Sequence, residues 1–406
     1  MSAPAWIAPT ALAALAVWVW LLLFRGLFWR TDQRLPPGAA PPAAPGDWPD
    51  VAVVVPARDE AGILPDSLPS LLAQEYPGRA GITFVDDNST DGTGDLARAL
   101  AERYGGLPLR VVTPGEPPPG WTGKLWALRH GIEQVRAPAS GDGPEFLLLT
   151  DADIAHAPDS LRTLVAAART GGYDLVSQMA RLRVVTGWER LIVPAFVYFF
   201  CQLYPFRRVN RARGRTAAAA GGCVLLRSSA ADRAGVPEAI RGALIDDVAL
   251  AGAVRRSGGR IWLGLADRVM SVRPCPGLPE LWRMVSRSAY AQLRRDPLIL
   301  LGAVAGLVLV YLVPPGAVVA GALTGDRVAL LAGGAAWAVM TATFLPMLRY
   351  YGQPAVFAPA LPFIALLYLL MTVESALRHH RGRGAAWKGR TYRGAGAPAA
   401  ERGADG

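Results

Sequence analysis

FLLLTDADI, residues 146–154, joins an apolar run directly to two carboxylates that stand two positions apart. The run 146–150 predicts a buried strand of a parallel sheet, because such strands are apolar on both faces. Ligands bind at the carboxyl ends of these strands, so Asp151 and Asp153 stand where a binding site is expected. Mg²⁺ is usually held by one or two carboxylates plus substrate phosphates, and this pair therefore predicts a divalent-metal site.

The residues around this stretch alternate between short β-rich runs and helical patterns. That alternation predicts βαβ units and a parallel sheet, and hence an α/β fold. The expected strands are residues 51–55, 82–85, 109–113 and 146–150, and the expected helices are residues 64–74, 93–104 and 124–135.

Acidic residues also follow two other expected strands, Asp59 and Glu60 after the first, and Asp86 and Asp87 after the second. A single carboxylate at a strand end has an alternative role as the cap of the next helix. Three acidic groups at one edge of the sheet favour a shared site instead.

Apolar residues pool at the two ends of the chain. Residues 5–24 carry no charge and are long enough to cross a hydrocarbon core as a helix. Arg25, Arg30 and Arg34 follow this run. A cleaved signal peptide is the alternative, but it has its charges before the apolar run, so we expect a retained anchor.

Three further apolar runs occupy residues 298–323, 328–348 and 355–377. Core helices of a soluble domain are the alternative, but these would show a polar stripe with a helical period, which the runs lack almost entirely. We therefore expect membrane insertion. Three spans after the central domain would leave the basic tail and the central domain on opposite sides of the membrane, although both are expected in the cytoplasm. We therefore expect either the first or the last of these runs to be re-entrant or interfacial.

The net charge of +10 alone would also suit a nucleic-acid binder. The basic residues gather beside apolar runs, at 25–34, 207–215, 283–295 and 378–393, which suits anionic headgroups and cytoplasmic placement instead. We expect no nucleic-acid partner, because the sequence has no basic and aromatic platform for single strands. The three widely spaced cysteines predict neither a disulfide framework nor a zinc site.

Five motifs in order make the chain resemble the family 2 glycosyltransferases. They are VVVPARDE at 53–60, VDDNSTDGT at 85–93, the pair Asp151 and Asp153, GGC at 221–223 and IDD at 245–247. The resemblance covers about residues 50–295. With the terminal apolar runs and WKGR at 387–390, the chain is most similar to the hopene-associated glycosyltransferases, with ceramide glucosyltransferases and carotenoid glycosyltransferases as relatives.

The resemblance implies an inverting transferase of the GT-A type, which moves a sugar from a UDP-sugar to a membrane lipid such as a hopanoid, with Mg²⁺ or Mn²⁺ as cofactor. It implies a mixed, mainly parallel sheet in an integral protein of a bacterial inner or plasma membrane, with the catalytic domain in the cytoplasm. The expected division is an anchor at 1–30, a linker at 31–46, a GT-A domain at 47–270, an interfacial helix region at 271–297, membrane helices at 298–377 and a basic tail at 378–406.

The same resemblance assigns roles to single positions. It implies that six residues contact the nucleotide-sugar: Pro56, Ala57, Glu60, Asp87, Lys124 and Asp151. Of these, Asp151 contacts the ribose and Lys124 approaches the diphosphate. It implies a metal ligand at Asp153, next to Asp151. For the acceptor, it implies a close approach of the backbone at Gly221 and Gly222 and a general base at Asp247. Asp246 would raise the pKa of Asp247 or orient the loop that carries it. Arg287 would contact the diphosphate of the donor.

Several of these positions have a plainer alternative. Lys124 could begin a solvated helix, and the glycine pair could serve only a turn. Asp247 could cap a helix, although capping and catalysis are compatible. Arg287 could contact lipid headgroups alone.

Two other functions fit the sequence less well. Processive polysaccharide synthases of the family carry Gln-x-x-Arg-Trp, whereas this chain reads Met-Val-Ser-Arg-Ser at 284–288, and the missing tryptophan speaks against a polymer product. A non-catalytic scaffold in lipid biosynthesis has no need of Asp151, Asp153 and Asp247.

Residues 188–206 are rich in aromatic and aliphatic residues and contain Pro194. This composition predicts a helix that lies in the headgroup layer, near the depth of a lipid hydroxyl. Burial in the soluble core is the alternative.

Overall fold

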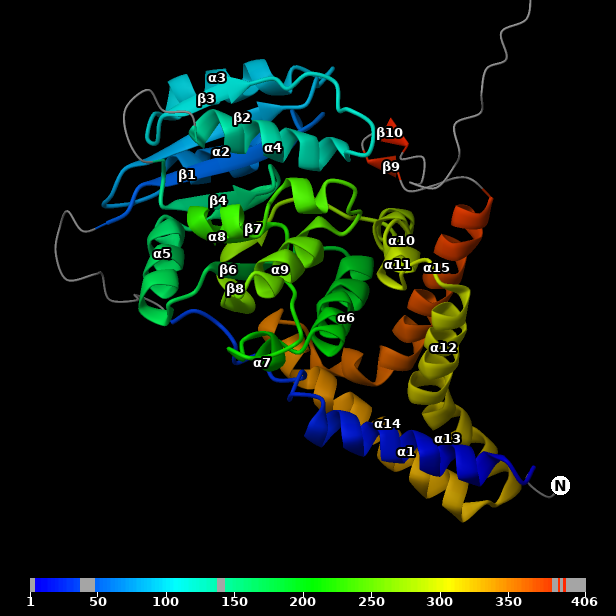
Figure 1. Cartoon of the computed structure of the whole chain (residues 1–406). Coiled ribbons are helices and arrows are strands. Elements are labelled where there is room, and N and C mark those ends of the chain that lie inside the picture. Colours follow the sequence, from blue (N-terminus) through cyan, green and yellow to red (C-terminus); the bar gives the residue numbers. More distant parts are fainter. Residues whose placement is uncertain (1–3, 37–47, 137–142, 382–385, 388–389, 392–406) are drawn as a thin grey trace, which may run out of the picture.

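The computed structural model describes residues 4–36, 48–136, 143–381, 386–387 and 390–391. At its centre is an eight-stranded sheet in the order β3-β2-β1-β4-β7-β6-β8-β5 (Figure 1). The strands are β1 (Val51–Ala57), β2 (Ala80–Asp86), β3 (Leu109–Val112), β4 (Phe146–Thr150), β5 (Ile154–His156), β6 (Leu175–Arg181), β7 (Cys223–Arg227) and β8 (Ile261–Ser271). A separate two-stranded sheet joins β9 (Ala386–Trp387) and β10 (Arg390–Thr391).

The large sheet is mixed and mainly parallel. β1 pairs in parallel with β2 and β4, β2 with β3, and β6 with β8. β7 runs antiparallel to β4 and β6, and β5 runs antiparallel to β8. This arrangement confirms the expected α/β fold class with a mixed sheet.

Helices cover both faces of the sheet, which is why β1 and β4 are buried along their whole length. Successive strand residues point to opposite faces. Val54 packs in one apolar core with Leu125, whereas Val53 packs in a second core with Leu64 and Leu164. The helices of this domain are α2 (Leu64–Leu72), α3 (Thr93–Tyr104), α4 (Gly123–Arg136), α5 (Ser160–Gly171), α7 (Phe206–Val209), α8 (Ser228–Arg233) and α9 (Asp246–Arg256).

All strands and helices expected between residues 51 and 150 are present, with ends that differ by a few residues. The strand after residue 109, for example, ends at Val112 rather than at Thr113. Residues 37–47, where the linker and the start of the domain were expected, lie outside the described residues.

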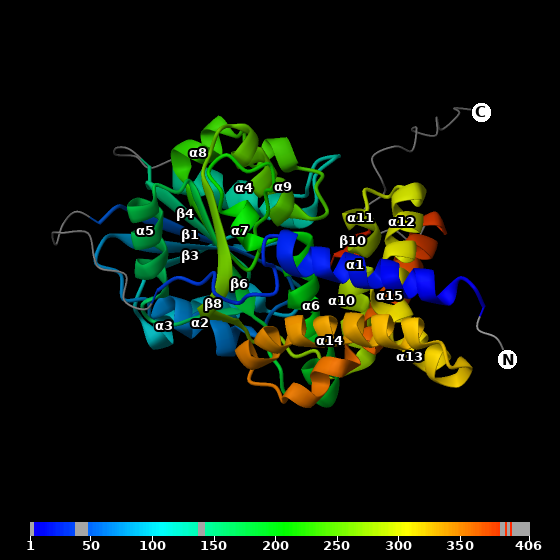
Figure 2. The ribbon, with the colours of Figure 1, turned by 90° about the horizontal axis from the view of Figure 1, so that it is seen from below.

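Four helical segments are long and apolar enough to cross a membrane, and they coincide with the four expected apolar runs. They are α1 (Ile7–Phe24), the continuous segment α12 (Pro297–Leu307), η2 (Val308–Leu312) and α13 (Val313–Thr324), then α14 (Arg327–Tyr350), and lastly η3 (Ala355–Ala360) with α15 (Leu361–His380). Figures 1 and 2 show α1, α13 and α14 side by side, and α12 beside α15.

Two consecutive prolines, Pro314 and Pro315, do not end the second of these segments. A π-helical turn, η2, precedes Pro314 and Pro315, and the chain continues as a helix on both sides of it. The carbonyl of Val310 within this turn accepts a hydrogen bond of 2.7 Å from the indole of Trp18 on α1. A polar group that the irregular turn exposes is therefore satisfied by a neighbouring helix.

The helix α6 (Gly187–Leu203) lies between the sheet and the apolar helices, where its residues Ile192, Val193 and Cys201 are buried. Tyr198 on α6 shares a hydrogen bond of 2.8 Å with Thr343 on α14. The structure therefore favours the alternative of burial for the middle of this helix, 8 of whose 17 residues are buried, and a headgroup position for its ends stays a prediction. Two of its aromatic side chains pack against the apolar helices, Tyr198 against Phe344 and Phe199 against Tyr368. Sequence composition does not distinguish such packing from insertion among headgroups.

Two short helices complete the connection between the sheet and α12. They are α10 (Leu278–Ser286) and α11 (Ala289–Gln292), and both pack against α15. The indole of Trp282 on α10 donates a hydrogen bond to Glu374 on α15. The segment that follows β8 is thus joined to the apolar helices by direct polar and apolar contacts.

Candidate active site

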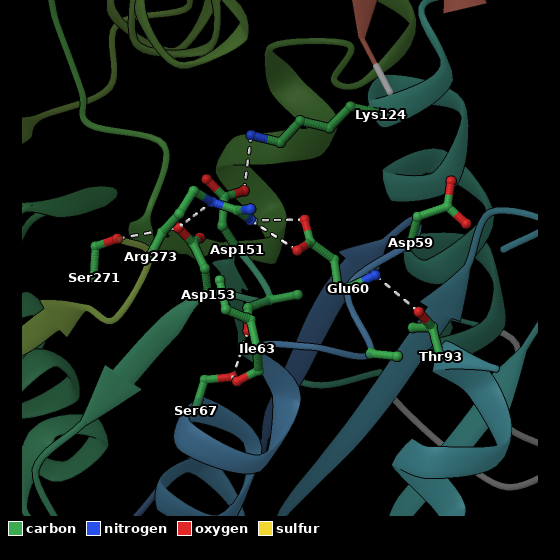
Figure 3. Close-up of polar contacts among 12 residues, drawn as sticks. Asp59, Glu60, Ile63, Ser67, Thr93, Lys124, Asp151, Asp153, Ser271 and Arg273 are labelled. Carbon is green, nitrogen blue, oxygen red and sulfur yellow. Dashed lines mark hydrogen bonds and ion pairs between the residues drawn. The ribbon is translucent and has the colours of Figure 1, made fainter. Parts of the chain in front are cut away.

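The carboxyl ends of β1, β2 and β4 meet at one edge of the sheet, as parallel pairing requires. Glu60 follows β1, Asp87 follows β2, and Asp151 and Asp153 follow β4 in the short turn before β5. Figure 3 shows the close approach of Glu60, Asp151 and Asp153 through the side chains that contact them. The structure therefore brings together the carboxylates that the sequence placed at strand ends.

Lys124, the second residue of α4, lies at the centre of one part of this edge. Its Nζ is 2.8 Å from Oδ1 of Asp151 and 3.0 Å from Oδ2 of Asp246. Burial alone would lower the pKa of the ammonium group, but the two carboxylates outweigh burial and raise that pKa above its ordinary value. Lys124 is therefore a fixed cation within the site and not the start of a solvated helix.

Asp247 lies in the first turn of α9, beside Asp246. Its Oδ2 accepts a hydrogen bond of 2.9 Å from the N–H of Gly221, and its Oδ1 accepts one of 2.8 Å from Val248. The N-cap of α9 is Ile245, so Asp247 does not cap the helix. Burial, followed by the like charge of Asp246, raises the pKa of Asp247 to about 7. A carboxylate with a pKa near the working pH has the property that a general base requires.

Gly221 and Gly222 permit a close approach between the start of β7 and the site. A Cβ on Gly221 would lie 3.5 Å from both Asp247 Oδ2 and Lys124 Nζ, and one on Gly222 would lie 3.0 Å from Ile154. Positive φ values occur at ten other glycines of the described chain and not at these two, so a left-handed turn is not their role. The tight contact is that of Gly222 with Ile154, since 3.5 Å at Gly221 is an ordinary van der Waals distance.

A second ion-pair group surrounds Asp153, and the sequence analysis missed its cation. Arg273, two residues after β8, has its Nε 3.0 Å from Oδ2 of Asp153. Its Nη2 donates to both carboxylate oxygens of Glu60, at 2.7 and 2.8 Å (Figure 3). Ser271 at the end of β8 donates a further hydrogen bond of 3.0 Å to Asp153. The sequence analysis predicted no strand beyond residue 150, so the end of β8 was not searched for a basic residue.

Three of the residues assigned to the nucleotide-sugar lie at or after the ends of β1 and β2. Pro56 and Ala57 are buried at the end of β1, and Pro56 lines a small cavity together with Lys124 and Asp151. Asp87 is completely buried, and its backbone carbonyl accepts a hydrogen bond of 2.6 Å from Arg58. The nucleoside roles of these residues remain predictions.

Arg287 lies apart from the acidic edge. It follows the last turn of α10 and its side chain is exposed. Among the contacts of the described residues, none joins its guanidinium to Asp151, Asp153 or Asp247. The structure thus does not bring Arg287 together with the other predicted residues.

A divalent ion fits this edge only with donors from a ligand. Among the described residues, no group of three or more His, Cys, Asp or Glu side chains is arranged to hold a metal. Asp151 and Asp153 are nonetheless adjacent hard donors, and Mg²⁺ commonly takes one or two carboxylates and completes its shell with water and substrate phosphates. The residues present therefore suit an ion that binds together with a diphosphate.

A family model described as "Glycosyltransferase like family 2" matches residues 49–291, which is more than half of the chain. The match covers every strand of the large sheet and both ion-pair groups described above.

Two kinds of curated relative share part of this region. The chain is 31% identical over 180 residues to an undecaprenyl-phosphate 4-deoxy-4-formamido-L-arabinose transferase of Pseudomonas aeruginosa, which covers 43% of this chain and 45% of the relative. It is 31% identical over 166 residues to a beta-monoglucosyldiacylglycerol synthase of Synechocystis sp., which covers 39% of this chain and 32% of the relative. The chain thus spans less than half the length of these relatives.

Among solved structures, the chain resembles the mannosyltransferase PcManGT from Pyrobaculum calidifontis in complex with GDP-Man and Mn²⁺. The TM-score is 0.54 at 20% identity, and the match covers 90% of this chain and 99% of that chain. At this identity the likeness concerns the fold, and it confirms the expected GT-A arrangement with apolar helices.

Proposed function

We propose that this chain moves a sugar from a UDP-sugar to a lipid alcohol at a membrane surface, with inversion at the anomeric carbon. The proposal proceeds from the family: the chain belongs to the glycosyltransferase-like family 2 and is a glycosyltransferase. The observation that carries this proposal is a pair of neighbours at the starts of two helices, α9 and α4. Asp247, with a pKa of about 7, stands beside Lys124, which Asp151 and Asp246 hold as a cation. One group suits a proton acceptor and the other suits a departing diphosphate.

In the proposed reaction, the hydroxyl oxygen of the acceptor attacks the anomeric carbon while the bond from that carbon to the diphosphate oxygen breaks. The hydroxyl proton passes to the carboxylate of Asp247, and the electron pair of the broken bond leaves with the diphosphate. The N–H of Gly221 and the N–H of Val248 each bond one oxygen of Asp247, so both fix its orientation. Lys124 lies where it can pair with the charge that develops on the leaving group.

The charges of the site favour a divalent cofactor, Mg²⁺ or Mn²⁺, with Asp153 and Asp151 as its ligands. Two cations, Lys124 and Arg273, face five carboxylates, those of Glu60, Asp151, Asp153, Asp246 and Asp247. This excess of negative charge repels a diphosphate. A divalent ion bound there would neutralise the diphosphate and act as a Lewis acid on it.

The acceptor class follows from the helices and from the relatives. Leu298, Leu323 and Leu331 on the apolar helices are 78, 82 and 71% exposed, which suits hydrocarbon and not water. The relatives named above are described by lipid products or carriers, an undecaprenyl phosphate and a diacylglycerol. The family resemblance adds a polycyclic lipid alcohol of the hopanoid kind, which we propose as the first acceptor to test.

The same observations support an integral protein of a bacterial inner or plasma membrane with a cytoplasmic catalytic domain. Basic residues flank the apolar runs, as is typical of the cytoplasmic side. The division into anchor, linker, catalytic domain, interfacial region, membrane helices and basic tail remains part of this proposal.

The test is transfer by the purified full-length protein in detergent. Radiolabelled UDP-sugars and GDP-mannose would be offered in turn with hopanoid alcohols, diacylglycerol or undecaprenyl phosphate. We expect label in the lipid extract from a UDP-sugar, its loss in EDTA and its return with Mg²⁺ or Mn²⁺. Transfer to water or to a growing polysaccharide only, or full turnover in chelator, would overturn the proposal.

A further inference from the structure

Arg273 connects two loops that the proposed donor must contact. Glu60 comes from the loop after β1 and Asp153 from the turn after β4, and the two carboxylates share one guanidinium (Figure 3). Two carboxylates that face one another repel, so a cation between them stabilises both loops in the absence of a ligand. The charges of Asp153 and Glu60 outweigh the effect of burial and raise the pKa of Arg273.

Arg273 is the member of this group that can leave. Its side chain is 38% exposed, whereas those of Glu60 and Asp153 are 10 and 15% exposed. Asp153 keeps other contacts, because Ser271 donates to its Oδ2 at 3.0 Å and the N–H of Val272 donates to its carbonyl at 2.9 Å. The carboxylate of Asp153 therefore stays in place when the guanidinium turns away.

We propose that Arg273 neutralises Asp153 and Glu60 in the donor-free enzyme and turns to the diphosphate when the donor binds, so that the divalent ion and the nucleoside diphosphate bind cooperatively. This inference rests on the proposed function. A guanidinium that binds the two oxygens of a carboxylate presents the same planar donors that phosphate oxygens accept. Arg273 therefore has two alternative anionic partners at one position.

The coupling follows from competition for Asp153. Without a diphosphate, a divalent ion must displace the guanidinium from Asp153 and gains no phosphate ligands in return, so the ion binds weakly alone. With a diphosphate, the arginine gains a new partner and the ion gains phosphate ligands. Because such coupling is reciprocal, the ion strengthens nucleotide binding by the same factor as the nucleotide strengthens ion binding.

The test compares the wild type with Arg273→Met, using the full-length protein in detergent. Mn²⁺ binding is followed by the electron paramagnetic resonance of the free ion, with and without UDP or GDP. Nucleotide binding is followed by calorimetry, with and without Mn²⁺. Arg268→Met is the matched control. Arg268 on β8 also forms an ion pair, with its Nε 2.8 Å from Oδ2 of Asp159, but Asp159 is not one of the carboxylates of the site.

We expect wild-type Mn²⁺ affinity to rise at least tenfold in the presence of UDP. In Arg273→Met, Mn²⁺ alone should bind more tightly than in the wild type, and UDP should bind roughly tenfold more weakly in the presence of Mn²⁺, on the scale of a charged hydrogen bond. The coupling factor should thus fall towards one, while Arg268→Met keeps the wild-type factor. Arg273→Lys keeps the charge and loses the planar donors, so it should give an intermediate factor, and it serves where the methionine variant does not fold.

Two results would overturn the inference. An unchanged coupling factor in Arg273→Met and Arg273→Lys would show that Arg273 does not exchange partners. Equal losses of Mn²⁺ and UDP affinity, together with a lower Tm, would make its role purely structural. Failure of the wild type to bind UDP or GDP even with Mn²⁺ would instead overturn the proposed function, and this inference with it.

Discussion

Replacing Asp246 by asparagine should lower the pKa of Asp247 and extend transfer activity to more acid pH. Burial is the largest cause of the raised pKa of Asp247, the like charge of Asp246 is the next, and Lys124 acts in the opposite direction. The substitution removes the charge of Asp246 and leaves Lys124 paired with Asp151 at 2.8 Å. The variant therefore loses one of the two effects that raise the pKa of Asp247 and keeps the charge of Lys124, which lowers that pKa.

The size of the effect follows from the titration of a single base. Only the carboxylate form of Asp247 accepts the proton, so wild-type activity should rise with pH through about 7 and be lost below it. One pH unit below its pKa, about a tenth of a carboxyl group is ionised. If Asp246→Asn lowers the pKa by roughly one unit, as loss of a close like charge suggests, about half of its limiting activity should remain at pH 6.

The assay is kcat/KM for the donor between pH 5.5 and 8.5, since this quantity reports the ionisation of the free enzyme. Each variant is compared with its own maximum, which separates the pH shift from any loss of activity. Lys124→Met is the opposite control, because removal of a positive charge should move the acid limb to higher pH. The reasoning is refuted if the limb stays at the same pH in both variants, or if Asp247→Asn retains near-normal transfer.

Three other outcomes are expected. Asp153→Ala should abolish transfer, because it removes a proposed metal ligand and not a packing group. Sedimentation and circular dichroism should show that the variant stays membrane-bound and folded. Turnover by the variant at the rate of the wild type would contradict this prediction. Trp18→Phe should lower the free energy of unfolding by about 1 kcal/mol in a detergent melt, because the carbonyl of Val310 loses its only observed side-chain donor among the described residues. A cysteine at Thr324 should react with an impermeant thiol reagent from outside intact cells and one at Arg381 should not, and the reverse pattern would invert the proposed orientation.

The acidic part of the site could be predicted because parallel strands align their carboxyl ends. Asp151 and Asp153 stand directly after a run that is recognisable as a strand from its own residues. Arg273 could not be placed in the same way, since the sequence does not reveal that β8 pairs with β5 and so ends beside Asp153. The role given to Arg287 stays a prediction: it came from a motif that is only partly kept here, and the side chain of Arg287, after α10, is exposed.

The last apolar run explains why a count of hydrophobic segments gave an odd number. It starts after Tyr350, whose hydroxyl donates to the carbonyl of Ala266 in β8. It then turns back along α14, where Trp337 donates to the carbonyl of Pro359 at 3.1 Å, about 20 Å of helix before Tyr350. It ends beside α11, where the N–H of Tyr290 donates to Ser375. Both ends of this run therefore lie near the large sheet or the helices that join it, and we propose that this run is the re-entrant one. On this proposal two crossings, by the bent segment α12–α13 and by α14, remain after the catalytic domain, and this even number is the one that a cytoplasmic end of α15 requires.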